Sequence, residues 1–246
     1  MNEGNSAESI IRVAVAGASG KMGSEAVRAL TKDGRFLVSA VLTRRSSGQA
    51  FDCKEYQDPE ELLAEDAPDV WLDFTDATSV VQNIDMVVRY GVRPVIGATG
   101  YTESDRLRWD AVLKERGIGG IAVPNFAVGA VLMMRFAREA ARFFDGVEII
   151  ELHHDGKKDA PSGTAKRTAE SLATARGGQA DNIPIHSVRL PGLVAHQEVL
   201  FGGQGEVLTI RHDSMNRSSF MPGVIIACRE VMHLSGLVYG MDELLR

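Results

Sequence analysis

A histidine pair, a lysine and a Pro-Ser-Gly-Thr turn follow one another within residues 151–164, which read ELHHDGKKDAPSGT. The histidines end an apolar alternating run over 147–152 that is typical of a strand, and a helical segment over 165–172 follows the turn. The unpaired N–H groups at the start of a helix bind anions. Imidazole and ammonium groups beside such a helix predict binding of a small carboxylate and a proton transfer near neutral pH.

Each part of this stretch also has a structural interpretation. Adjacent residues of a strand point to opposite faces, so one of His153 and His154 at most is expected to face a site. Ser162 or Thr164 alone would be explained as a helix N-cap that binds free backbone N–H groups. The combination of the histidines, Lys157 and a helix start in one short stretch favours the catalytic interpretation.

A glycine-rich turn near the beginning of the chain follows an apolar strand over 11–16 and precedes a helical pattern over 25–30. A strand, a glycine turn and a helix in this order predict a dinucleotide site, because glycines allow a tight turn and close approach of the backbone to a pyrophosphate. An ordinary turn between a strand and a helix is the alternative. The residues of the turn, spaced as G-x-x-G-x-x-G, are Gly17, Ala18, Ser19, Gly20, Lys21, Met22 and Gly23.

The end of the next predicted strand, 36–42, indicates which dinucleotide would bind. A site for NADH usually has a carboxylate here that binds the ribose hydroxyls. This chain has the neutral Thr43 followed by Arg44 and Arg45, and arginines suit a 2′-phosphate. We therefore expect NADPH as the preferred cofactor, with the use of NADH left open. A solvated basic loop is the alternative interpretation.

The first half of the chain alternates predicted strands with predicted helices, the helices over 80–90 and 103–116. Repeated βα units predict a parallel sheet, and ligands of such sheets bind beyond the carboxyl ends of the strands. The residues that follow three of these strands are therefore expected to border the cofactor. They are Asp73, Phe74, Thr75, Gly97, Ala98, Thr99, Gly100, Pro124, Asn125 and Phe126.

The pattern changes after about residue 127, where a helix over 130–143 is followed by the histidine strand. Three more predicted strands, 185–190, 194–201 and 207–212, have no helix between them, which predicts a mixed or antiparallel sheet in a second domain. Trp109, Phe143 and Phe144 are expected in the core.

The predicted fold is α/β, with an N-terminal Rossmann-like parallel-sheet domain and a second α+β domain with a mixed or antiparallel sheet. A helix over 220–234 and a strand over 237–239 are expected to return to the first domain. The predicted division has a disordered tail (1–10), a dinucleotide-binding domain (11–126 and 217–246) and a domain for substrate binding and oligomerisation (127–216).

Composition excludes several classes of protein. A net charge of −6 gives no support for nucleic-acid binding, and no apolar run approaches the roughly 20 residues of a membrane span. Residues 1–9 are polar and lack the features of a signal peptide. The two cysteines, Cys53 and Cys228, fit a reducing compartment, so we expect a cytoplasmic protein. No metal site is predicted, because the histidine pair lacks further ligands at a suitable spacing.

Taken together, the motifs resemble those of the 4-hydroxy-tetrahydrodipicolinate reductase (dihydrodipicolinate reductase) family. The glycine turn, Asp73–Thr75, Gly97–Gly100, Pro124–Phe126 and 151–164 occur in that family's order, and the resemblance extends over 11–246. It implies an N-terminal dinucleotide domain completed by the C-terminal tail. It also implies a central substrate domain that builds a homotetramer, and a role in lysine and diaminopimelate biosynthesis.

Carried over position by position, the resemblance implies that His153 is the proton donor and acceptor and that Lys157 is a second catalytic cation. His154 with Ser162, Gly163 and Thr164 would hold the carboxylates of a small dicarboxylate substrate. The glycine turn would hold the pyrophosphate, and the arginines would lie at the adenosine end. The residues implied at the nicotinamide are Phe74, Gly97, Ala98, Thr99, Val123, Pro124, Asn125 and Phe126.

The chain departs from the family pattern at three positions. Gly156 stands where a third histidine is frequent, Thr43 where an acidic residue is frequent, and Ala98 where threonine is frequent. Two other functions remain open on the sequence. One is a reductase of another small imine or keto acid, and the other is an NADPH-binding redox sensor without catalysis, which would have no use for His153 and Lys157.

Overall fold

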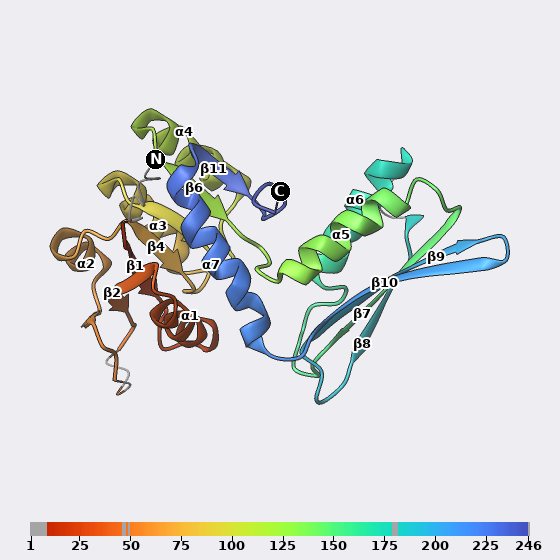
Figure 1. The fold of residues 1–246 in the computed structure, drawn as a ribbon, viewed down its shortest axis with the longest axis horizontal. Helices are drawn as coiled ribbons and strands as arrows, with labels where there is room; N and C mark the ends of the chain where they lie inside the picture. The colour runs from red at the N-terminus through yellow and green to blue at the C-terminus, as the bar shows by residue number, and fades with distance from the viewer. Residues whose placement is uncertain (1–8, 46–47, 49, 179–181, 246) are drawn as a thin grey trace, which may run out of the picture. The chain divides into compact units, whose positions relative to one another are not determined.

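The structure is a computed structural model that describes residues 9–45, 48, 50–178 and 182–245. The chain divides into two compact units, drawn in Figure 1. Unit 1 comprises the chain up to Phe126 and from Met221 onward, and unit 2 comprises Ala127–Phe220. Unit 2 is therefore inserted within the sequence of unit 1. The tail predicted over 1–10 lies outside the described residues except for its last two positions.

The second boundary between the units lies at 221, where the sequence predicted 217. The reason is local bonding. The 3-10 helix η2 (Arg217–Phe220) stays attached to the end of the preceding strand, because the Ser219 and Ser214 hydroxyl groups are hydrogen-bonded at 3.1 Å.

Unit 1 contains a seven-stranded sheet in which every described pairing is parallel. Its order is β11-β6-β5-β4-β1-β2-β3. The chain moves outward from β1 through β2 to β3, then returns beside β1 and moves outward on the other side. The strand order thus reverses between β1 and β4, which is where ligands of such sheets bind. The strands are β1 (Ile11–Ala16), β2 (Phe36–Leu42), β3 (Lys54–Tyr56), β4 (Val70–Asp73), β5 (Arg93–Ile96), β6 (Gly119–Ala122) and β11 (Gly236–Tyr239).

Helix α4 of unit 1 begins and ends where its sequence provides caps. The helix predicted over 103–116 is confirmed, because Thr102 and Asp105 form a capping box before it and Gly117 ends it at φ +65°. The missed element is β3, which is too short to show an alternating pattern. The helices are α1 (Lys21–Lys32), α2 (Pro59–Glu65), α3 (Val80–Tyr90), α4 (Glu103–Arg116) and α7 (Met221–Glu230), followed by the 3-10 helix η3 (Val231–His233).

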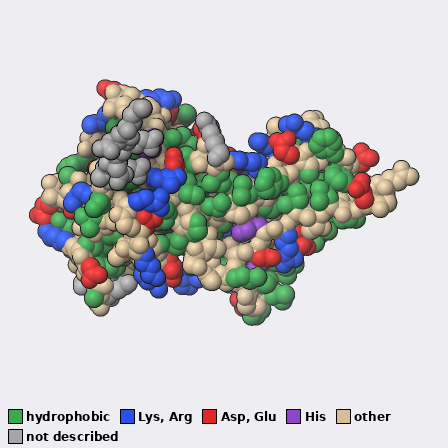
Figure 2. Space-filling model, in the orientation of Figure 1, with side chains coloured by type: hydrophobic (Ala, Val, Ile, Leu, Met, Phe, Trp, Pro, Cys, Tyr) green, Lys and Arg blue, Asp and Glu red, His purple; other side chains and the backbone are tan. Residues whose placement is uncertain are grey.

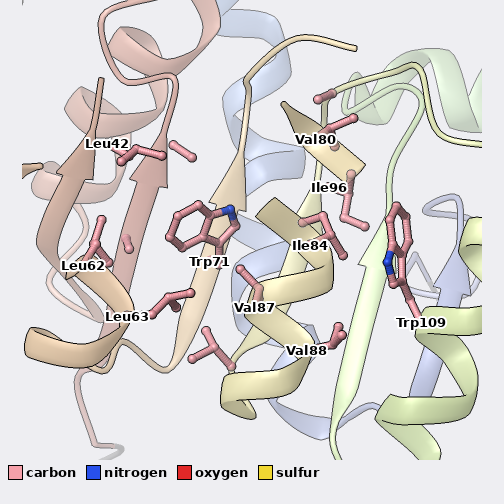
Figure 3. Close-up of a cluster of buried hydrophobic side chains, with 14 of the residues drawn as sticks. Leu42, Leu62, Leu63, Trp71, Val80, Ile84, Val87, Val88, Ile96 and Trp109 are labelled. Carbon is pink, nitrogen blue, oxygen red and sulfur yellow. The ribbon is translucent and has the colours of Figure 1, made fainter. Parts of the chain in front are cut away.

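One part of the core of unit 1 lies between the sheet and the helices α2, α3 and α4. Helix α1 also contacts β1 and β2, and its buried residues lie outside this cluster. Figure 3 shows Leu62 and Leu63 of α2 near Trp71 of β4, and Trp109 of α4 near Ile96 of β5. All five side chains are buried, as predicted for Trp109. The continuous apolar runs of β1 and β4 follow from this arrangement, since strands at the centre of a parallel sheet are covered on both faces.

Unit 2 contains a four-stranded mixed sheet in the order β10-β9-β7-β8. Strands β7 (Gly146–His153) and β8 (Ile185–Arg189) are parallel, whereas β9 (Ala195–Gly203) is antiparallel to both β7 and β10 (Glu206–Ser214). Helices α5 (Val128–Ala140) and α6 (Gly163–Arg176) supply the rest of its core. The predicted mixed sheet is confirmed.

One predicted core residue of unit 2 is exposed. Helix α5 ends at Ala140 rather than 143, so Phe143 lies beyond the helix and is 83% exposed. Phe144 is half-buried and packs against the core, with its ring 5.6 Å from that of Phe201. Figure 2 shows further hydrophobic side chains along α5.

Across the described residues, no helix has the length and apolar character that crossing a membrane requires.

Candidate active site

The turn after β1 depends on two of its glycines. Gly17 has φ +75°, and its N–H donates to the Leu42 carbonyl at 2.9 Å. A Cβ atom at Gly17 would lie 2.5 Å from the Phe74 carbonyl oxygen, and one at Gly23 would lie 2.2 Å from the Gly17 carbonyl oxygen. Larger residues would therefore separate β1, β4 and α1, so the glycines set the close packing of this turn.

The first turn of α1 is open to an anion. Gly20 occupies the N-cap in an extended conformation without a side-chain cap, and the turn contains no acidic residue. Ser19, Gly20 and Lys21 are exposed, whereas Ala18 and Gly23 are buried and Met22 is half-buried. An uncapped helix start beside a lysine has the charge and the N–H donors that bind a phosphate. These residues fit the pyrophosphate of a dinucleotide.

Several residues predicted to border the nicotinamide meet at the carboxyl edge of the sheet. The rings of Phe74 and Phe126 pack edge to face, with centroids 5.6 Å apart. A Cβ atom at Gly97 would lie 2.3 Å from the Phe74 ring, so glycine is required there. Ala98 and Val123 are buried and Thr99 is exposed, while Pro124 and Asn125 are half-buried.

Asp73, the last residue of β4, bonds to the loop that follows the strand. Its buried carboxylate accepts hydrogen bonds from the Thr75 N–H and hydroxyl at 2.9 and 2.5 Å. Trp71 Nε1 and Asn83 Nδ2 donate to its other oxygen at 3.0 and 3.1 Å. Burial raises the pKa of Asp73, and the donors oppose this shift. The sequence placed Asp73 at the rim, but its carboxylate faces inward and fixes the Phe74 loop.

The surroundings of the predicted 2′-phosphate site contain two carboxylates that the sequence argument did not place there. Thr43 is buried, and its hydroxyl donates to Glu55 Oε1 of β3 at 2.6 Å. Arg44 pairs with Asp76, whose pKa is lowered to about 2 by hydrogen bonds from Thr78 and Ser79 and by the charge of Arg44. Arg45 is exposed. The preference for NADPH thus stays a prediction.

In unit 2, His153 is the last residue of β7, and its Nδ1 is hydrogen-bonded to the carboxylate of Glu151. Glu151 has no exposed surface. The two residues share one face of the strand because they are two positions apart. His154 follows the strand and is exposed. The expectation that one of the two histidines at most faces a site stays a prediction.

Arg189 of β8 binds the same carboxylate with two nitrogens. Its Nη1 and Nη2 lie 3.0 and 2.7 Å from the two oxygens of Glu151. The guanidinium also donates to the carbonyl of Val188 at 2.7 Å and to that of Asp159 at 2.8 Å. Since His153 and Arg189 are register partners of adjacent strands, the sheet itself brings these groups together.

The pKa values of Glu151 and His153 are both lowered from their usual values. Although burial alone would raise the pKa of Glu151, hydrogen bonds from Arg189, Ser187 and His153 outweigh it and hold the pKa below its usual range. Burial lowers the pKa of His153, and the hydrogen bond to Glu151 opposes that shift. Glu151 is therefore ionised near neutral pH, and the protonated form of His153 loses its proton at a lower pH than a free imidazole does.

Lys157 lies in the loop between β7 and α6, where its Nζ binds both carboxylate oxygens of Asp159 at 2.7 and 2.8 Å. Its side chain is 21% exposed, so a ligand can reach the ammonium group. Gly156 stands where a third histidine is frequent in the family, and a Cβ atom there would lie 3.3 Å from His154 Nδ1. A residue larger than glycine would therefore restrict the His154 imidazole, which has more room beside glycine.

The start of α6 combines a cap with free N–H groups. Ser162 is the N-cap, and its hydroxyl accepts from the Ala165 N–H at 3.1 Å, as the structural interpretation expected. Its own N–H donates to Glu151 at 3.2 Å. Gly163 is exposed and Thr164 half-buried in the first turn, which contains no acidic residue. The helix start is thus attached to the His153 cluster through Glu151.

Other histidines have structural partners. His186 Nε2 lies 2.7 Å from Glu148, and His196 Nδ1 lies 2.7 Å from Asp213. Among the described residues, no group of three histidine, cysteine, aspartate or glutamate side chains could hold a metal ion. The absence of a metal site nevertheless stays a prediction.

Sequence reasoning missed Glu151, Arg189 and Asp159. The signal for Glu151 was available, since a charged residue stood at an inward position of an apolar strand, two before a histidine. Arg189 had no such signal, because its position opposite His153 depends on the pairing of β7 with β8.

A glycine turn at the reversal point of a parallel sheet, joined in one chain to a histidine and lysine cluster, defines the class of dinucleotide-dependent oxidoreductases. Within that class, the chain belongs to the dihydrodipicolinate reductase family. The family's N-terminal domain matches residues 11–126, and its C-terminal domain matches residues 129–245.

Individual relatives agree with this assignment. The chain is 50% identical over 262 residues to the 4-hydroxy-tetrahydrodipicolinate reductase of Geobacillus kaustophilus (strain HTA426), with 96% of this chain and 99% of the relative covered. It is 48% identical to that of Lactococcus lactis subsp. cremoris (strain MG1363), with 96% and 97% covered. A solved structure of dihydrodipicolinate reductase with bound dipicolinate, from Paenisporosarcina sp. TG-14, has a TM-score of 0.87 and 42% identity, and the match covers 95% of this chain and 99% of that one.

Proposed function

We propose that the protein reduces 4-hydroxy-tetrahydrodipicolinate to tetrahydrodipicolinate with NAD(P)H, in lysine and diaminopimelate biosynthesis. The observation that carries the proposal is the cluster at the end of β7. His153, Lys157 and the start of α6 are held together there by Glu151, Arg189 and Asp159. The family membership supplies the identity of the substrate, since a site for carboxylates does not by itself distinguish one dicarboxylate from another.

In unit 1, the first turn of α1 and Lys21 would hold the pyrophosphate, and Phe74, Gly97 and Phe126 would border the nicotinamide. When bound, the reduced nicotinamide supplies a hydride. The residues of this edge position the ring, because the two aromatic side chains and the close glycine leave a defined apolar surface.

In unit 2, side chains and backbone N–H groups would bind the substrate carboxylates and supply a proton. Lys157, His154 and the N–H groups of Gly163 and Thr164 would bind the substrate carboxylates, and Lys157 would exchange its bond to Asp159 for one to the substrate. The substrate loses its hydroxyl group as water and becomes a conjugated imine. Hydride would add to the carbon–carbon double bond conjugated with the imine and leave an enamine. The enamine carbon next to the hydride-accepting carbon then takes a proton from the His153 imidazolium, which restores the carbon–nitrogen double bond.

The catalytic role is tested by His153→Gln, with His186→Gln as the matched control. The substrate is generated in situ by condensing pyruvate with aspartate semialdehyde, and oxidation of NADPH is followed by absorbance. We expect turnover to fall about 10²- to 10⁴-fold for His153→Gln, because general acid catalysis contributes about that much, with NADPH affinity nearly unchanged. Retained turnover would refute the catalytic role. A wild-type protein that binds NADPH and does not oxidise it would favour the sensor or another substrate.

We also propose that NADPH is preferred over NADH. Arg44 and Arg45 support the proposal as donors for a 2′-phosphate. The carboxylates of Glu55 and Asp76, which bind Thr43 and Arg44, would repel a 2′-phosphate. Binding of the two cofactors to an arginine variant tests which effect is larger. Arg44→Ala is expected to weaken NADPH binding far more than NADH binding. Equal losses for the two cofactors would remove the phosphate argument. Arg28→Ala, which removes an exposed arginine of α1, is the control.

A homotetramer in the cytoplasm completes the proposal, with unit 2 as the substrate-binding and assembly domain. Ile150, Leu200 and Val207 support assembly through this unit. Ile150 and Leu200 alternate with the buried Ile149 and Val199, so they point to the other face of the sheet, and Val207 is 69% exposed. Light scattering after size-exclusion chromatography gives the mass directly. A monomeric mass would refute the tetramer.

A further inference from the structure

A carboxylate with no exposed surface lies at the centre of unit 2's cluster. Glu151 accepts hydrogen bonds from His153 Nδ1, from two nitrogens of Arg189, and from the backbone N–H of Ser162. Burying a charged group is unfavourable unless it is paired and hydrogen-bonded, and here both oxygens are satisfied. The mechanism above does not use Glu151, so its place beside the proton donor calls for an explanation.

We propose that Glu151, held by Arg189, is a positioning residue that fixes the proton of His153 on Nδ1 and thereby makes Nε2 the atom that delivers the proton to the substrate. The reaction named here rests on the proposed function. The protonation pattern of the ring does not, and it is measured separately below.

The assignment of the proton follows from the partners of Glu151. An ionised carboxylate accepts hydrogen bonds and donates none, so the nitrogen facing it must carry the hydrogen. Two donors from the guanidinium of Arg189 keep Glu151 ionised. The neutral imidazole therefore has a lone pair on Nε2, and the proton that comes and goes is the one on Nε2. When the ring is protonated, the carboxylate stabilises its positive charge.

Arg189 extends the same positioning to Lys157. Its guanidinium donates to the carbonyl of Asp159, whose carboxylate binds the ammonium of Lys157. One buried ion pair therefore holds the imidazole, the start of α6 through Ser162, and the loop that carries the second cation. A change at Glu151 is expected to disturb all three together.

The charged groups around His153 determine how its pH dependence changes. Glu151 faces it from β7, Arg189 from β8, and Lys157 from the loop, where Asp159 accompanies Lys157. Burial and the two cations favour the neutral ring, and the carboxylate favours the protonated ring. Removing the negative charge therefore lowers the pKa of His153 further. Because the proton donor must be protonated, activity is then lost at a lower pH than in the wild type.

The ring is measured first in the unaltered protein. ¹⁵N NMR of histidine-labelled protein, with His153→Gln used to assign the signals, distinguishes the two neutral forms of the imidazole. We expect the neutral ring of His153 to carry its hydrogen on Nδ1. A hydrogen on Nε2 would overturn the proposal, whether or not the protein has the proposed activity. This measurement needs no substrate, so a failure of the proposed function is seen separately, as a wild-type protein without turnover.

Glu151→Gln then tests the consequence for the reaction, and Glu148→Gln is the matched control. Glu148 lies on the same strand and binds His186 outside the cluster. We expect kcat of Glu151→Gln to fall about 10- to 10⁴-fold, between the effect of groups that orient a metal-bound imidazole and that of a carboxylate that orients a catalytic imidazole, with KM for NADPH unchanged. The loss of activity at high pH should begin at a lower pH. The control should stay within about twofold of the wild type, as a surface change does.

Two further variants keep the test decisive. Glu151→Asp retains the charge, so it should keep the pH at which wild-type activity is lost even where kcat falls. Arg189→Lys keeps a cation and removes the two-nitrogen contact, so a smaller loss of kcat is expected. A folded Glu151→Gln protein with the wild-type pH profile would overturn the proposal. If Glu151→Gln fails to fold, an Asp variant with a shifted profile would overturn it instead.

Discussion

Replacing Asp73 with asparagine tests how the loop that carries Phe74 is held. In the wild type, two donors from Thr75 face one carboxylate oxygen, and donors from Trp71 and Asn83 face the other. Asparagine has nearly the same shape, but it replaces one oxygen with an NH₂ group. If the NH₂ group faces Trp71 and Asn83, both of these donors lose their acceptor. If it faces Thr75, the Thr75 hydroxyl can accept from it and the Thr75 N–H alone loses its acceptor, so this orientation costs less.

The magnitude follows from these contacts. A hydrogen bond to a charged group contributes about 1.5–3 kcal/mol, so the one bond lost in the less costly orientation corresponds to about 1.5–3 kcal/mol. Part of this is offset, because burial disfavours the charged form of Asp73 and a neutral residue avoids that penalty. We expect the free energy of unfolding of unit 1 to fall by about 1–2 kcal/mol.

The assay uses the two tryptophans of the chain, Trp71 and Trp109. Both are buried in unit 1, so tryptophan fluorescence during urea unfolding reports on unit 1 rather than on the whole chain. Thr75→Val removes one of the four donors and should cause less than half of the loss. Asp145→Asn, at an exposed position of unit 2, should leave this transition unchanged.

A stability for Asp73→Asn within about 0.5 kcal/mol of the wild type, the range of ordinary surface changes, would refute the reasoning. It would mean that the donors find other acceptors at no cost. The loop would then be held by the packing of Phe74 against Phe126 and not by the buried carboxylate.

Two other predictions concern the stability of unit 2. Ser162→Ala removes the N-cap of α6, so circular dichroism during urea unfolding should show that the free energy of unfolding falls by about 1 kcal/mol. Ser171→Ala, inside the same helix, should show no such loss. Equal effects of the two substitutions would contradict the capping role. The lowered pKa of Glu151 predicts that stability present above pH 4.5, its ordinary value, is lost as the pH falls, because the unfolded chain binds the proton first. Other carboxylates, such as Asp159 and Asp213, also have lowered pKa values, so urea unfolding across that range should have a positive slope with pH that Glu151→Gln reduces. An unchanged slope in this variant would refute the assignment.

Much of the fold was predictable because its signals are local. Helices such as α4 carry their caps in the sequence, and the glycine turn after β1 identifies the reversal point of the sheet. The strand β3 and the exposure of Phe143 were not predictable in this way. The first gains its place from pairing with β2, and the second depends on where α5 ends.

The residues of the candidate site also differ in whether a local sequence signal identifies them. His153 and Lys157 were identified because they lie in one short stretch with a helix start. Glu151 has a sequence signal, but its meaning depends on Arg189, which is 38 residues away and arrives through the pairing of β7 and β8. In unit 1, the carboxylate of Glu55 beside Thr43 was missed because β3 was missed. Groups that act on a reacting residue through tertiary contacts leave little trace in a single sequence.

The insertion of unit 2 within unit 1 sets an order of events during synthesis. The ribosome completes unit 2 before it makes α7 and β11, so unit 2 can fold while unit 1 still lacks its last strand. Until β11 (Gly236–Tyr239) emerges and pairs with β6, the edge of β6 has unpaired backbone groups, which are open to pairing with other chains. Synthesis of β11 therefore supplies the strand that covers this edge of β6, after unit 2 has been made.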